Sequence, residues 1–149
     1  MDYFDLLEDL SGESYEAFIE FLCEHSDKFY FITRKELDFP KEALQKFKPY
    51  IIKQYKTKEW ESTITAGPPA TLYEIDINHQ TIDLLKSSAN KLYDWVQPEL
   101  PEDLSFLKNG FPWFYTCTHE EFAQFQIRSD FYRNLLFANE HIKVQQIKE

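Results

Sequence analysis

The residues best suited to chemistry lie in one stretch, residues 100–127, LPEDLSFLKNGFPWFYTCTHEEFAQFQI. His119 is flanked there by Thr118 and by Glu120 and Glu121, and an imidazole beside a carboxylate can act as a general base with an orienting acid. Neighbouring residues of an extended strand point to opposite faces, so His119 and Glu120 converge only if the chain turns. The Thr118-to-Glu121 spacing also fits a capping box. We favour a polar turn over a catalytic pair.

Cys117 precedes His119 by two residues and shares its face if the chain is extended, and a Cys–His pair can activate a thiolate. Cys117 also follows Trp113-Phe114-Tyr115, which favours a place in the core. The only other cysteine, Cys23, forms no CxxC motif, so both are expected to be reduced and buried. No two histidines share a short spacing and HExxH is absent, so we expect no metal and no cofactor.

Glu99, Glu102 and Asp103 surround two prolines and form a stiff acidic segment. These carboxylates could bind a basic partner by charge-assisted hydrogen bonds. They could equally belong to a solvated loop in which Asp103 accepts bonds from nearby backbone N–H groups. Aromatic side chains such as tryptophan are typical interface anchors. The predicted partner-binding residues are therefore Glu99, Glu102, Asp103, Trp113, His119 and Glu120.

Charge and composition limit the classes of partner. The chain has 149 residues and a formal net charge of −10, from 26 acidic and 16 basic residues. This charge repels nucleic-acid phosphates and anionic membranes, and it attracts basic proteins. Solubility alone is the other explanation for the acidity. We expect a basic protein as partner, no nucleic acid and no membrane, and the oligomeric state is left open.

The same composition predicts one folded, cytoplasmic domain over residues 1–149. Hydrophobic residues make up 43% and aromatic residues 17% of the chain, which is too apolar for a disordered protein. The first ten residues, MDYFDLLEDL, lack the basic region of a secretory signal. No apolar run approaches the roughly 20 residues of a membrane span.

Hydrophobic periodicity and turn residues predict an α+β fold. The expected sheet is antiparallel, with about four to six strands, and helices at both ends of the chain pack on one of its faces. Asn109-Gly110 predicts a hairpin turn, and Gly67-Pro68-Pro69 predicts another that pairs residues 58–65 with 71–77. Residues 142–149 are expected to be frayed. Expected helices cover 2–9, 14–26, the segment after Pro40, 78–92 and the segment after Ser129, with a short turn at 51–55; expected strands are 28–33, 58–65, 71–77, 104–107, 112–117 and 122–127.

A run of spaced motifs resembles a family of small uncharacterised bacterial proteins that often carry a sporulation-related label. The motifs are Trp60-Glu61-Ser62-Thr63, Ala70-x-Leu72-Tyr73, Trp95-x-x-Pro98, Leu100-Pro101-Glu102-Asp103-Leu104-x-Phe106-x-x-x-Gly110-x-x-Trp113 and Thr118-His119-Glu120. The resemblance covers residues 15–139 and departs where a glycine is expected after the first tryptophan. It implies a bacterial origin and a shared fold, and no established activity.

These observations favour a non-catalytic, acidic protein-binding module, and a toxin-neutralising immunity protein is one form of it by analogy with other small acidic proteins. One alternative is a small enzyme that uses His119 with a nearby Glu, Asp or Cys. The other is a sporulation-associated or scaffold protein.

Overall fold

Strand β2 (Lys28–Thr33) shows why the sheet is covered on both faces. Its sequence, KFYFIT, is apolar at successive positions, so neither face of this strand suits water. Phe29 and Phe31 point to one face and belong to the main hydrophobic core. Tyr30 and Ile32 point to the other face and belong to a second, smaller cluster. Each face therefore needs its own covering layer.

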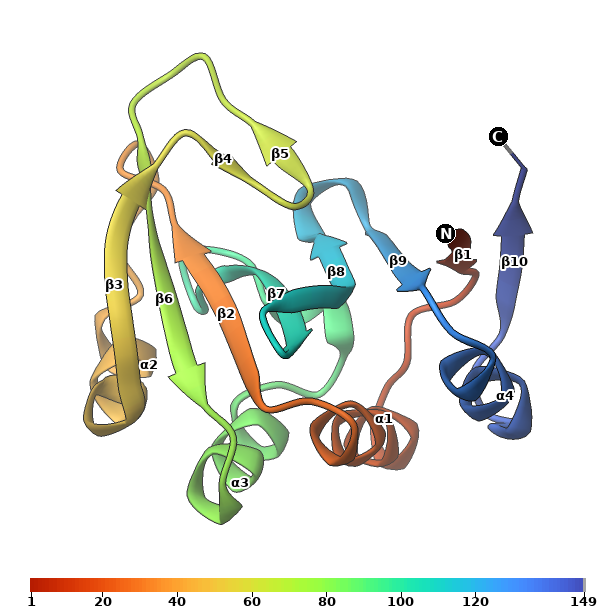
Figure 1. Cartoon of the computed structure of the whole chain (residues 1–149). Coiled ribbons are helices and arrows are strands. Elements are labelled where there is room, and N and C mark those ends of the chain that lie inside the picture. Colours follow the sequence, from red (N-terminus) through yellow and green to blue (C-terminus); the bar gives the residue numbers. More distant parts are fainter. Residues whose placement is uncertain (149) are drawn as a thin grey trace.

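In the computed structural model, residues 1–148 are described, and they place β2 inside an eight-stranded antiparallel sheet (Figure 1). The order across the sheet is β10 (Val144–Ile147), β1 (Asp2–Leu6), β9 (Phe122–Ile127), β8 (Phe111–Cys117), β7 (Glu102–Lys108), β2, β6 (Ala70–Asp76) and β3 (Ile51–Thr57). The first and last strands of the described residues lie side by side, because β1 pairs with β10.

Helices and the main core lie on the first face of the sheet. Its helices are α1 (Glu13–Glu24), α2 (Lys41–Phe47) and α3 (His79–Ser88), and α4 (Asp130–Ala138) packs near β9. Trp95 stacks on Phe31 with ring centroids 5.9 Å apart, and its indole N–H donates to the Tyr15 hydroxyl at 2.9 Å. These contacts join α1 to the sheet through fully buried aromatic rings.

A short hairpin covers the second face. Its strands are β4 (Glu59–Trp60) and β5 (Thr63–Ile64), and they pair only with each other. The hairpin connects β3 to β6 and lies above the middle of the sheet in Figure 1. The cluster beneath it contains Tyr30, Ile32, Trp60, Ala70, Leu72 and Leu107.

The structure corrects the expected fold class. The expected sheet of four to six strands with helices at both ends is wrong, because the sheet has eight strands and both ends of the described chain are strands. Residues 2–6 were expected in a helix, yet Phe4 and Leu6 alternate with more exposed residues and form β1. Residues 144–147 were expected to fray and instead form β10; residue 149 lies outside the described residues.

Two further expectations are wrong near β3. Residues 51–57 form an edge strand rather than a short turn. Residues 58–65 do not pair with 71–77, because β6 pairs instead with β3 and β2. Gly67-Pro68-Pro69 instead lies in the loop that connects β5 to β6.

Elements with strong local signals are confirmed. Strand β2 has the predicted bounds, and β7 and β8 meet at Asn109-Gly110 as predicted. Helix α3 begins with a capping box, in which Thr81 N donates to Asn78 Oδ1 at 3.0 Å and Asn78 N donates to Thr81 Oγ1 at 2.9 Å. The side chain of Ser129 caps α4.

Candidate functional site

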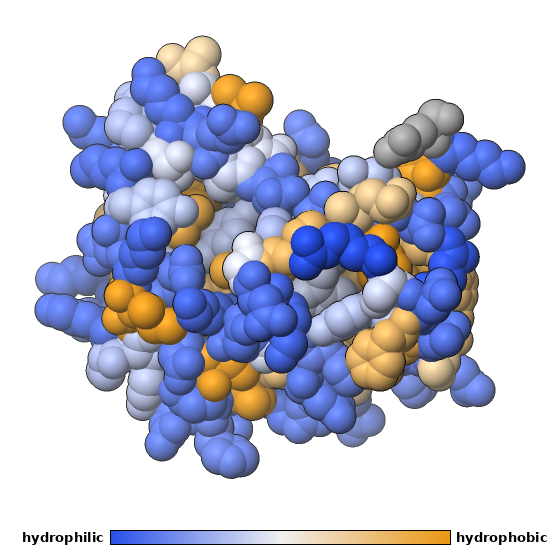
Figure 2. Space-filling model, in the orientation of Figure 1, coloured by the Kyte–Doolittle hydropathy of each residue, from blue (hydrophilic) through white to orange (hydrophobic). Residues whose placement is uncertain are grey.

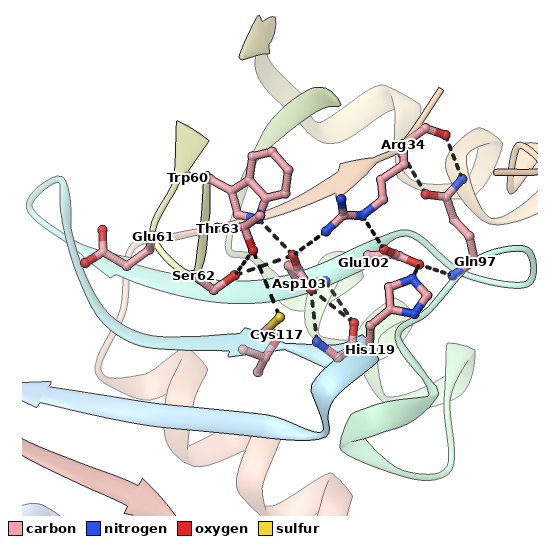
Figure 3. Close-up of polar contacts among 12 residues, drawn as sticks. Arg34, Trp60, Glu61, Ser62, Thr63, Gln97, Glu102, Asp103, Cys117 and His119 are labelled. Atoms are coloured by element: carbon pink, nitrogen blue, oxygen red, sulfur yellow. Dashed lines mark hydrogen bonds and ion pairs between the residues drawn. The ribbon is translucent and has the colours of Figure 1, made fainter. Parts of the chain in front are cut away.

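Two adjacent buried carboxylates, Glu102 and Asp103, lie where a β-bulge interrupts the pairing of β7 with β2. Ile32 is opposite Glu102 and Tyr30 is opposite Ser105, so β7 has one extra residue in this stretch. Asp103 has a φ of 57°, in the left-handed region that Asp adopts more readily than most residues. Consecutive strand residues normally point to opposite faces. The bulge instead brings both carboxylates to the face beneath the hairpin (Figure 3).

Glu102 is fully buried and bonded through both of its oxygens. Arg34 Nε donates to Glu102 Oε1 at 3.0 Å. The backbone N–H of Gln97 donates to Oε2 at 3.0 Å, and His119 Nε2 lies 2.7 Å from the same oxygen. An isolated buried carboxylate is very costly, and these donors are what allow Glu102 to remain in the interior.

Asp103 is also fully buried and has a separate set of donors. Its Oδ2 accepts from Trp60 Nε1 at 2.8 Å and from Ser62 Oγ at 3.5 Å. Its Oδ1 accepts from the backbone N–H and the hydroxyl of Thr118, at 3.0 Å and 3.2 Å. Arg34 Nη2 lies 3.9 Å from Oδ2, so one guanidinium faces both carboxylates.

Gln97 extends this network to the end of β2. Its side-chain oxygen accepts from the backbone N–H of Arg34 at 2.6 Å. Its side-chain nitrogen donates to the backbone oxygens of Arg34 and Asp38 at 3.3 Å and 3.0 Å. Gln97 therefore binds the chain after β2 to the segment that precedes β7.

The network, defined here as Arg34, Trp60, Ser62, Gln97, Glu102, Asp103, Thr118 and His119, joins four separate parts of the fold. They are the end of β2, the β4–β5 hairpin, the segment before β7, and the 3₁₀ turn Thr118–Glu120 (Figure 3). Buried polar groups stabilise a unique arrangement when every member is satisfied. The arrangement therefore fixes the hairpin over the sheet.

The structure pairs His119 with a nearby glutamate, as the enzymatic alternative expects, and places the Cys117 thiol against Thr63 instead. His119 meets Glu102 rather than Glu120, and Glu102 is already occupied by Arg34 and Gln97. The Cys117 thiol lies 4.0 Å from Thr63 Oγ1. Burial, followed by the charge of Asp103, raises the pKa of Cys117. A raised pKa disfavours the thiolate that nucleophilic catalysis requires.

The six predicted partner-binding residues are divided between interior and surface. Glu102, Asp103 and Trp113 are buried, and the Trp113 indole donates to Ser26 Oγ at 2.8 Å. The other three, Glu99, His119 and Glu120, are exposed. Asp103 accepts a hydrogen bond from the backbone N–H of Thr118, which is the kind of contact that the alternative interpretation of this segment predicted.

The network contains three residues that the sequence did not indicate as site residues: Arg34, Trp60 and Gln97. Each is distant in sequence from the carboxylates: 68 residues separate Arg34 from Glu102, and 43 separate Trp60 from Asp103. Pairing of buried charges offers a partial signal, because two interior acids require a nearby base. That rule does not identify which of the 16 basic residues supplies it.

Both thiols are expected to react slowly in the folded protein. Burial raises the pKa of Cys23 to about 12 and also raises that of Cys117. Alkylation by iodoacetamide at pH 8 should be at least about 100-fold slower than in guanidinium, as measured by mass spectrometry. Rapid labelling of Cys117 in folded protein would contradict this expectation.

The same shift predicts a loss of stability at alkaline pH. An unfolded thiol ionises near pH 8.5, whereas the folded Cys23 thiol stays neutral up to about pH 12. The contribution of this thiol to the free energy of unfolding should therefore be constant below about pH 8 and fall above it. Cys23→Ala should show a smaller alkaline fall, measured by urea unfolding at pH 7 and pH 10.

Comparison of the chain with family models, with curated proteins and with solved structures finds no match. Among residues 1–148, no helix has both the length and the apolar character needed to cross a membrane. Within those same residues, no group of three or more His, Cys, Asp or Glu side chains is placed to bind a metal ion.

Proposed function

We propose that this protein is a non-catalytic binding module for a basic protein, and that helix α1 carries the contact. The observation behind the proposal is the distribution of charge along the chain. Every charged side chain in the first 27 residues is acidic: Asp2, Asp5, Glu8, Asp9, Glu13, Glu16, Glu20, Glu24 and Asp27. A surface of one charge sign attracts and steers a partner of the opposite sign.

The α1 carboxylates form one row. Glu13, Glu16, Glu20 and Glu24 are spaced by three or four residues and are all exposed, so they lie along one side of the helix. The opposite side of α1 packs into the core through Tyr15, Phe18, Ile19, Leu22 and Cys23. Lys86 pairs with Glu20 and neutralises one member of the row. Glu24 lies 4.0 Å from Nε2 of the adjacent His25, and with Glu13 and Glu16 it is available to a partner's lysine or arginine side chains.

Toxin neutralisation is the specific form of this function that we propose. An immunity protein acts by occupying a surface of its partner, which requires charge complementarity and no catalytic residues. The fully bonded carboxylates of the network and the raised pKa of Cys117 support a binding role over the enzymatic alternative.

A pair of charge-matched variants tests the proposed surface. The first carries Glu13→Gln, Glu16→Gln and Glu24→Gln. The control carries Glu36→Gln, Glu42→Gln and Glu140→Gln, which are exposed acids outside α1.

The probe for both variants is a fluorescent nona-arginine peptide at 20 mM and 200 mM salt. The first variant should bind about tenfold more weakly at low salt, since each surface ion pair contributes about 0.2–1 kcal/mol. The control should change by less than about twofold. Equal weakening of both variants would contradict the proposal, because only net charge would then matter.

A further inference from the structure

A cleft lies on the hairpin-covered face of the sheet, next to the network, with which it shares Trp60. It has a volume of about 280 Å³ and opens between the β4–β5 hairpin and strands β3, β6, β2, β7 and β8. Figure 2, drawn in the same orientation as Figure 1, shows a mostly hydrophilic surface with small and separate hydrophobic patches. The residues that give the cleft its chemistry are Tyr30, Tyr55, Glu59, Trp60, Glu61 and Glu74.

The aromatic walls of the cleft are fixed by the hairpin and the sheet. Trp60 is held by its bond to Asp103 at 2.8 Å. The Tyr30 hydroxyl accepts from the backbone N–H of Glu61 at 3.2 Å, which seats the hairpin above the floor of the cleft. Tyr55 is 41% exposed on the edge strand and is the wall that a ligand reaches first. The rings are therefore preorganised, which lowers the cost of binding.

The cleft is electrically negative. Its lining contains three carboxylates, and of these Glu74 pairs with Lys28 at 3.2 Å. One oxygen of Glu61 accepts from the Gln126 amide at 2.6 Å, so its other oxygen is available. The Glu59 carboxylate has no hydrogen-bond or ion-pair partner among residues 1–148. Glu59 and Glu61 thus supply unshared acceptors beside aromatic rings.

Two of these rings already contact cations from the protein itself. The Arg34 guanidinium carbon lies 5.2 Å from the Trp60 ring centroid, and Lys53 Nζ lies 5.0 Å from the Tyr55 ring centroid. Aromatic faces attract ammonium and guanidinium groups by their quadrupoles. Hard metal ions prefer shells of oxygen ligands instead, so aromatic walls favour an organic cation.

We propose that this cleft is a binding site for an organic cation, either a free polyamine or the ammonium or guanidinium group of a lysine or arginine side chain. The cation lies against Tyr55, the exposed ring of the cleft, and is bonded by Glu59 and Glu61. The site is independent of the function proposed for α1, because α1 packs on the opposite face of the sheet. Its volume suits one headgroup rather than a larger molecule.

Titration with a charged probe and its uncharged analogue tests the site. The indole N–H signal of Trp60, assigned with Trp60→Phe, is followed by NMR as methylguanidinium or N-methylurea is added. Methylguanidinium should give a saturable shift, and N-methylurea, of nearly the same shape, should bind at least tenfold more weakly. A linear shift, or an equal response to both probes, would overturn the proposal.

Variants then separate the contributions of the lining residues. Glu59→Gln and Glu61→Gln should each weaken methylguanidinium binding about threefold to fivefold. Tyr55→Leu should weaken it by a similar factor. Lys53→Ala should tighten it about threefold, because this lysine competes for the Tyr55 ring. Glu140→Gln, an exposed acid outside both α1 and the cleft, has the same change in net charge and should leave the affinity unchanged. Unchanged affinity in both glutamate variants of the cleft would overturn the site.

Two further probes identify the source of the cation. Spermidine and N-acetyl-arginine-N-methylamide are titrated under the same conditions. Tighter binding of spermidine than of the arginine amide assigns the site to a free polyamine, and the reverse assigns it to a protein side chain. The cleft assignment fails if neither probe displaces methylguanidinium. Because the nona-arginine test depends on α1 and this one on Glu59 and Glu61, each proposal can fail without the other.

Discussion

Arg34→Met is expected to lower the free energy of unfolding by about 3–5 kcal/mol, the range for removing one partner from a buried ion pair. Arg34 faces both Glu102 and Asp103, and both carboxylates have an exposed fraction of 0%. Without the guanidinium, two negative charges remain in the interior with only neutral donors and the half-exposed His119. Urea unfolding at pH 7 measures the loss.

Two comparisons make this expectation specific. Arg128→Met removes another arginine, one stacked on Phe111 at 3.5 Å and exposed, and should cost less than about 1 kcal/mol. In a protein that already carries Glu102→Gln and Asp103→Asn, the further change Arg34→Met should cost far less than it does alone. An Arg34→Met protein as stable as Arg128→Met would show that the buried carboxylates do not depend on the guanidinium.

Trp60→Ala is expected to cost about 3–5 kcal/mol and to release the β4–β5 hairpin from the sheet. Trp60 is 6% exposed and covers the small cluster on the second face. Its removal also takes one donor from buried Asp103. Hydrogen exchange at the backbone N–H of Thr65, which donates to Lys58 O at 2.8 Å across the hairpin, reports the local opening.

The matched control for this prediction is Trp60→Phe, which keeps most of the ring and removes only the indole N–H. It should cost about 1–3 kcal/mol and leave the Thr65 amide protected. Should Thr65 stay equally protected in Trp60→Ala, the hairpin would be held by something other than the tryptophan.

The elements predicted correctly have signals contained within a few consecutive residues. The aromatic run of β2, the Asn109-Gly110 turn and the Asn78 cap of α3 are local features. Strands β1 and β3 were missed because their short, mixed sequences gain a strand conformation from partners elsewhere in the sheet. The sequence of such a segment is compatible with a helix or a strand, and pairing with distant strands determines which of the two forms.

The network could not be predicted from the sequence for a second reason, which is that the backbone of β7 is irregular at Glu102 and Asp103. Regular alternation places Glu102 and Asp103 on opposite faces of β7, and a sequence gives no direct sign of a bulge. The left-handed conformation of Asp103 brings the two carboxylates together, and only then does one arginine serve both. The motif that resembles a known family includes these residues, but the resemblance itself stays a prediction.

The pairing of β1 also bears on the order of folding. This first strand lies between β9 and β10, with Asp2 opposite Ile127 and Tyr3 opposite Ile147. A growing polypeptide therefore carries β1 without a neighbour until residues 122–127 of β9 have been synthesised. Contacts of such long sequence separation slow folding, so this side of the sheet is expected to form late, after the central hairpins have assembled.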